Sequence, residues 1–61
     1  MYEITFFGRK GPIAYRIVDS LGTAIDWLYS LYPEPDYFLI SGNNRVFRPY
    51  KGLIAEIHPA S

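Results

Sequence analysis

The chain has 61 residues, no cysteine and one histidine, and its six lysines and arginines balance six aspartates and glutamates. This length allows one small domain, and the absence of cysteine excludes disulfides and thiolate metal sites, while one histidine does not make a zinc site. The neutral charge argues against a strongly basic nucleic-acid-binding protein, and no apolar run is long enough to span a bilayer.

The composition favours a protein that binds another macromolecule through its surface. Aromatic residues make up 18% of the chain, and a domain of this size cannot bury all of them. We expect several at the surface, where a cluster marks an interface that a second copy of the chain would cover. The N-terminal segment lacks the basic start and long apolar stretch of a signal peptide, so we expect a cytoplasmic protein with no cofactor.

The first third of the chain predicts a hairpin. Residues 2–7 and 13–18 alternate in the manner of strands, and Gly8-Arg9-Lys10-Gly11 separates them. The same four letters match the G-x-x-G loop with which KH domains clamp a nucleic-acid backbone. That loop joins two helices, whereas this one joins two strands, so a hairpin turn is the favoured interpretation.

A helix is predicted over residues 20–32. Asp19 and Ser20 are both good N-caps, and Pro33 excludes helical geometry from the residue before it. The inward stripe consists of apolar residues three and four apart, namely Leu21, Ala24, Ile25, Leu28, Leu31 and Tyr32. Trp27 and Tyr29 are then borderline or outward on the helix.

The last third of the chain predicts three strands. Residues 36–41 contain the continuous apolar run 37–40, which favours an inner strand. Residues 45–48 follow a Gly-Asn-Asn turn, and Pro49 predicts that this strand lies at an edge or ends there. Residues 53–57 predict a short fifth strand, and we expect His58, beside Pro59, to lie in a frayed terminus.

Together these elements predict one α+β domain over residues 1–61, in the order ββαββ(β), with one helix packed on one face of a small sheet. This order resembles the β-grasp pattern of ubiquitin-like and small immunoglobulin-binding domains. An antiparallel sheet with a C-terminal meander is the alternative.

Charge is separated along the chain. Residues 19–36 hold four acids and no base, a charge of −4, and the remaining residues hold six bases and two acids, a charge of +4. Such separation steers docking to a complementary partner, and Trp and Tyr dominate binding hot spots. We therefore expect a non-catalytic protein-binding module, an adaptor or an inhibitor that occludes the surface of a larger protein. The expected protein-binding residues are Asp26, Trp27, Tyr29, Glu34 and Asp36. In size and fold class such a protein resembles the small accessory and inhibitor proteins of phages and plasmids.

Two other functions follow less directly from the sequence. Single-stranded nucleic-acid binding would use basic hairpins and exposed aromatics, with phosphate contacts and base stacking shared among Arg9, Lys10, Arg16, Arg45, Phe47, Arg48, Tyr50 and Lys51. Catalysis would have to use Glu56 and His58, which share a face if the last strand persists. No nucleophile motif accompanies this pair, so we expect no enzyme and no catalytic residue.

Overall fold

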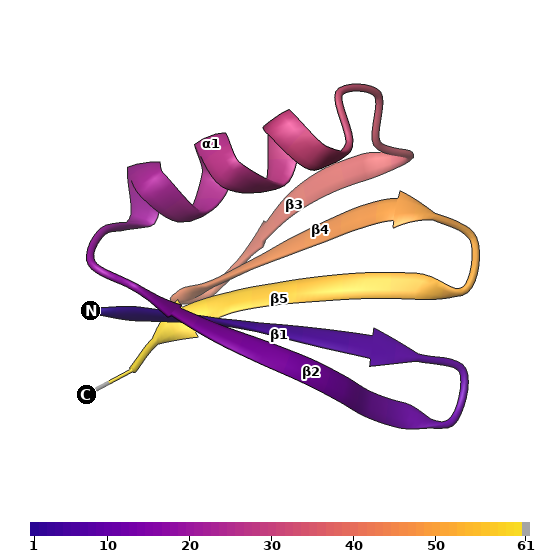
Figure 1. Cartoon of the computed structure of the whole chain (residues 1–61), viewed down its shortest axis with the longest axis horizontal. Coiled ribbons are helices and arrows are strands. Elements are labelled where there is room, and N and C mark those ends of the chain that lie inside the picture. Colours follow the sequence, from indigo (N-terminus) through magenta and orange to yellow (C-terminus); the bar gives the residue numbers. More distant parts are fainter. Residues whose placement is uncertain (61) are drawn as a thin grey trace.

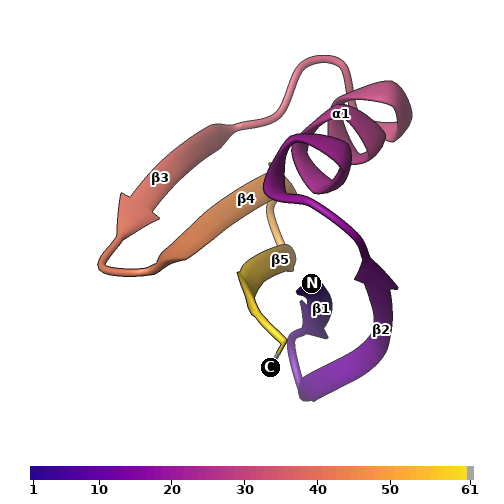
Figure 2. The ribbon, with the colours of Figure 1, turned by 90° about the vertical axis from the view of Figure 1, so that its left-hand side faces the viewer.

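The computed structural model describes residues 1–60, which form one helix and a five-stranded sheet. The elements in chain order are β1 (Tyr2–Gly8), β2 (Gly11–Val18), α1 (Leu21–Leu31), β3 (Tyr37–Ser41), β4 (Asn44–Tyr50) and β5 (Leu53–Pro59). The helix lies against one side of the sheet (Figures 1 and 2). The α+β class predicted from the sequence is therefore confirmed.

The sheet has the strand order β2-β1-β5-β4-β3, and every neighbouring pair is antiparallel. The last three strands form a meander, as the alternative interpretation expected, and β5 then pairs with β1. The β-grasp-like order ββαββ(β) is not matched exactly, because the chain order is ββαβββ, with a fifth strand that is a full strand of seven residues and includes His58. His58 is therefore not in a frayed terminus, since it pairs with Glu3 of β1.

Two strands occupy positions other than those predicted. β3 is an edge strand, and Leu39 and Ile40 within it are exposed, so its apolar run does not mark an inner strand. β4 lies between β3 and β5 rather than at an edge. The structure accommodates Pro49 where the β4–β5 register shifts, between Phe47 and Tyr50, since an irregular pairing does not require a ladder hydrogen bond from every residue.

The β1–β2 connection is a hairpin turn, as predicted. Gly8 pairs with Gly11, and Arg9 and Lys10 form the tip. Gly11 has a φ of 121°, a conformation that L side chains rarely adopt, so glycine is required there. The β4–β5 turn lies at the same end of the molecule as this hairpin (Figure 1).

The helix begins and ends within one residue of the prediction. The Ser20 hydroxyl accepts a hydrogen bond of 3.1 Å from the backbone N–H of Thr23, and the helix ends at Leu31 with Tyr32 as its C-cap. Ala24 and Leu28 are buried, whereas Leu31, predicted in the inward stripe, is exposed. The helix thus contacts the sheet mainly through one narrow stripe.

The core lies between the helix and the sheet. Its fully buried residues are Ile4, Ala24, Leu28, Phe47, Ala55 and Ile57. The sheet residues among them face one another across the strands, as Ile4 pairs with Ile57 and Phe47 with Ala55. Since side chains alternate along a strand, the intervening residues of every strand point to the opposite side.

Candidate protein-binding surfaces

The side of the sheet away from the helix, here called the open face, is covered by no element among residues 1–60 (Figure 2). The strand register assigns to it the residues that alternate with the core. They are Glu3, Thr5, Phe7, Pro12, Tyr15, Ile17, Tyr37, Leu39, Val46, Arg48, Ile54, Glu56 and His58. Most of them are apolar, which is unusual for a sheet face that meets solvent.

The open face exposes large apolar side chains at both edges of the sheet. On β2, Tyr15 is 70% exposed and Ile17 43%, and on β3, Leu39 is 54% exposed. Between them, Phe7, Val46 and Ile54 are half-buried. The exposed apolar side chains thus form two groups, one on each edge strand, and exposed apolar surface marks interaction sites on soluble domains.

The polar part of the open face centres on His58. Its Nε2 atom lies 3.9 Å from the Glu3 carboxylate and 3.4 Å from the Thr5 hydroxyl, and that hydroxyl donates a 2.9 Å hydrogen bond to Glu3. A histidine that activates a hydroxyl uses one ring nitrogen for the nucleophile and the other for the orienting acid. Here the same nitrogen faces both groups, so the cluster resembles a surface polar network. Glu56 and His58 share this face, as predicted.

The predicted helix site is partly built into the core. The Trp27 ring is half-buried and packs edge-on against Phe6, with a centroid distance of 6.0 Å, and the Arg16 guanidinium lies 4.6 Å from its centroid. Tyr29 is partly exposed, but its ring contacts Phe47 edge-on at 5.1 Å. These two rings therefore lie at the border of the core, and Asp26, which precedes Trp27 in the chain, is exposed.

The other two predicted acids lie in or beside the connection from α1 to β3. Glu34 is exposed, and Asp36 is held in place by Arg48. The Asp36 backbone N–H donates to the Arg48 carbonyl at 2.8 Å, and its carboxylate lies 3.6 Å from the Arg48 Nε. Asp36 is thus separated from the helix residues and belongs to the sheet edge.

The residues proposed for nucleic-acid binding are dispersed. Phe47 is fully buried, so its ring is not accessible to a base, and Arg16 lies over Trp27. Arg45 is at the start of β4, beside the β3–β4 turn. The remaining members gather where the β1–β2 and β4–β5 turns meet, and they are Arg9, Lys10, Arg48, Tyr50 and Lys51.

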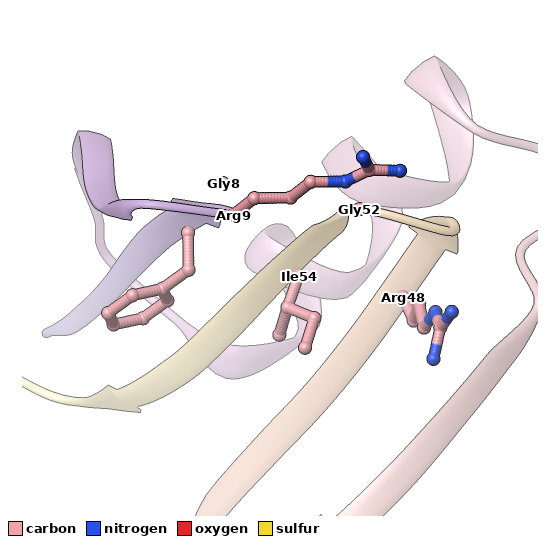
Figure 3. Close-up of a pocket in the computed structure, with 6 residues that line it drawn as sticks. Gly8, Arg9, Arg48, Gly52 and Ile54 are labelled. Atoms are coloured by element: carbon pink, nitrogen blue, oxygen red, sulfur yellow. The ribbon is translucent and has the colours of Figure 1, made fainter.

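At this same end, a pocket of about 220 Å³ opens on the sheet. Its lining residues come from β1, β4, β5 and the two turns, and they are Phe7, Gly8, Arg9, Arg48, Gly52 and Ile54 (Figure 3). Two arginines thus border a partly apolar hollow. Sequence reasoning placed both in the nucleic-acid set but did not pair them, because Arg9 and Arg48 are brought together only by the β1–β5 pairing.

The open face is the surface that sequence reasoning missed. A signal for it existed in Tyr15 and Ile17, which lie two residues apart in β2 and therefore place two large apolar side chains on one side of that strand. Whether the helix covers that side depends on the sheet topology, which the alternation alone does not predict.

Comparisons with known proteins found no relative of this chain. No protein-family model matches the chain, and no curated protein or solved structure is significantly similar to it. Among residues 1–60, no three His, Asp or Glu side chains come together as metal ligands. The described part of the chain also contains no helix with the length and apolarity needed to cross a membrane.

Proposed function

We propose that this chain is a non-catalytic protein-binding module that occludes part of the surface of a larger protein through its open face. The observation that carries the proposal is the exposure of Tyr15, Ile17 and Leu39 on the side of the sheet that does not carry the helix. Folding leaves this apolar area in contact with water, so its burial against a partner would contribute favourably to the free energy of binding.

The size of the open face fits such an interface. Five strands spaced about 4.8 Å apart, each rising about 3.3 Å per residue over roughly seven residues, give a face of about 550 Å². The Cα extents of 28 × 24 × 21 Å are consistent with this estimate. Stable specific interfaces bury about 600–1,000 Å² on each partner and transient ones bury less, so the open face has the size of a small or transient interface.

Charge on the open face indicates what the partner presents. Glu3 lies toward the end of the sheet where the chain termini are found, Glu56 lies at the middle of the central strand β5, and Arg48 lies toward the turn end. A complementary surface therefore has apolar groups opposite the two edge strands, a basic group opposite the two glutamates and an acidic group opposite Arg48. The apolar side chains of β2 and β3 supply binding energy, and the charges set orientation.

The test compares the open face with the helix surface predicted from the sequence. A photo-crosslinking amino acid replaces Tyr15 in one variant and Asp26 in a second, and each is irradiated in lysate of the native cell. We expect a discrete crosslinked protein with the Tyr15 variant alone. The captured protein, once purified, should bind the wild-type chain, and Tyr15→Thr should weaken this binding about 30-fold or more, as a hot-spot residue does.

Two outcomes would overturn the proposal. A partner captured from the Asp26 position and not from the Tyr15 position would assign binding to the helix. Analytical ultracentrifugation of the pure chain provides the second: a stable dimer that Tyr15→Thr dissociates would show that a second copy occupies the open face.

A further inference from the structure

The pocket at the turn end has two cationic walls and an apolar floor. Figure 3 shows Arg9 extending above Gly52 and Arg48 on the other side of Ile54. Phe7 and Ile54, which pair across β1 and β5, supply the apolar part. Phe7, Arg48 and Ile54 also belong to the open face, but the inference below concerns the chemistry of this one pocket and does not require a partner on the rest of that face.

Arg9 is positioned by a glycine. A Cβ placed on Gly52 would lie 3.2 Å from the Arg9 Nε and 3.7 Å from one of its terminal nitrogens, and Gly52 has a φ of 97°. The guanidinium therefore packs directly on backbone that a side chain would obstruct. Within residues 1–60, Arg9 takes part in no ion pair.

Arg48 is constrained on its other side. Its Nε lies 3.6 Å from the Asp36 carboxylate, too far for a good hydrogen bond, and no hydrogen-bond acceptor within residues 1–60 reaches this buried atom. The guanidinium also lies 5.6 Å from the centroid of Tyr37. These contacts hold the side chain at the pocket wall while its hydrogen-bonding capacity is only partly used.

We propose that this pocket binds a carboxylate carried on a compact apolar group. Two guanidinium groups and the Asp36 carboxylate leave one net positive charge at the site, which matches a singly charged anion better than a phosphate dianion. A planar guanidinium also fits the geometry of a carboxylate with two parallel hydrogen bonds.

The volume sets the size of the apolar group. A cavity of about 150 Å³ accommodates benzene, so about 220 Å³ is sufficient for a benzene-sized ring with a carboxylate attached. The ring would lie on Phe7 and Ile54, and the carboxylate would lie between Arg9 and Arg48. A drug-sized ligand is too large for this hollow, since such pockets usually measure about 300–1,000 Å³.

The test is an NMR titration of the full chain with benzoate, and benzamide serves as the neutral control of the same shape. We expect amide shifts confined to the pocket, at Gly8, Gly52 and Ile54, with a dissociation constant of about 1 mM, as suits so few atoms. Arg9→Gln should weaken binding about tenfold, and Arg45→Gln, at the other end of β4, should leave it unchanged.

Gly52→Ala provides a second, independent variant, since it displaces Arg9 without removing charge and should weaken benzoate binding in the same direction. Comparison of N-acetylphenylalanine with benzoate then distinguishes the end of a polypeptide from a free acid as the source of the carboxylate. Tighter binding of either one supports the site.

Three results would overturn the proposal: no pocket shifts up to about 20 mM benzoate, equal binding of benzamide, or phenyl phosphate binding more than about tenfold tighter than benzoate. The last would assign the pocket to phosphate groups. Unchanged benzoate affinity in both Arg9→Gln and Gly52→Ala would also contradict it, because the cationic wall would then contribute nothing.

Discussion

The two faces of the sheet are built from the same strands and from similar residues, yet they have opposite environments. On the helix side, Ile4, Ala55 and Ile57 are fully buried. On the open face, Phe7 of β1, Ile54 of β5 and Tyr15 of β2 remain partly or largely exposed. One helix is enough to cover one face, so apolar residues on the other must meet solvent or another molecule.

The comparison shows that a residue's contribution depends on its face more than on its type. Burial of an apolar side chain contributes to folding only where water is excluded, at roughly 25 cal/mol per Å². The helix side therefore carries the stability of the fold, and the open face remains available for binding. Substitutions on the two faces should accordingly separate stability from binding.

The largest effect is expected at Phe47, which is fully buried and contacts the rings of Tyr29, Tyr32 and Phe38. Phe47→Ala should destabilise the fold by about 3–5 kcal/mol, because it removes a large apolar side chain and leaves a cavity. A core of this size supplies about 3–5 kcal/mol in total, so the variant should be largely unfolded by circular dichroism. Phe47→Leu, the control, should remain folded. A folded Phe47→Ala variant would mean that the helix side does not dominate stability.

Trp27 should give an intermediate effect, since it lies at the border of the covered face. Trp27→Ala removes the edge-on contact with Phe6, worth about 0.5–1.5 kcal/mol, the cation–π contact with Arg16, worth about 0.5–1 kcal/mol, and part of the buried area. We expect a loss of about 2–3 kcal/mol in urea unfolding.

Arg16→Gln is the matched control for Trp27, because it removes only the cation above the ring and should cost under about 1 kcal/mol. If Trp27→Ala leaves the unfolding free energy unchanged, the ring is a surface anchor for binding, as the sequence suggested. Trp27 would then not belong to the core.

A much smaller effect on stability is expected at Tyr15, on the open face. Tyr15→Thr keeps a residue that favours strands and removes a ring that is 70% exposed, so the unfolding free energy should change by about 0.5 kcal/mol or less. The chemical shifts of the core should be unchanged. A loss above about 2 kcal/mol would show that Tyr15 is packed in solution and that the open face is covered.

Local chemistry explains how much of this fold was predictable. The Ser20 N-cap, Pro33 after the helix and Gly8 and Gly11 at the hairpin act over a few residues, so helix and turns were predicted within a residue or two. The alternation in β2 also indicated an apolar side. Each of these signals depends on neighbours in the chain.

Sheet order was less accessible, because it depends on contacts between residues far apart in the sequence. The apolar run of β3 suggested an inner strand, yet β3 is at an edge and exposes Leu39 and Ile40. The Arg9–Arg48 pocket likewise requires β1 to pair with β5, and no spacing in the sequence specifies that pairing. The candidate sites were hidden for the same reason, since both arise from the tertiary arrangement.

The smallest effect is expected at the Asp36–Arg48 pair, where two principles oppose each other. The Asp36 side chain is 53% exposed and that of Arg48 30%, and an ion pair this accessible contributes under about 1 kcal/mol. Against this, the Arg48 Nε is buried without a hydrogen-bond acceptor, and depriving such an atom of its nearest carboxylate can cost about 1–3 kcal/mol.

We expect the effect of solvent exposure to outweigh that of the unpaired Arg48 atom, so Asp36→Asn should lower the unfolding free energy by under about 1 kcal/mol. The backbone hydrogen bond from Asp36 to Arg48 is kept in this variant. The difference from wild type should vanish near 1 M salt, where screening acts within about 3 Å. Urea unfolding at low and high salt measures both quantities. A salt-independent loss above about 2 kcal/mol would instead show that the carboxylate compensates a buried charge, and that this corner of the open face is part of the core.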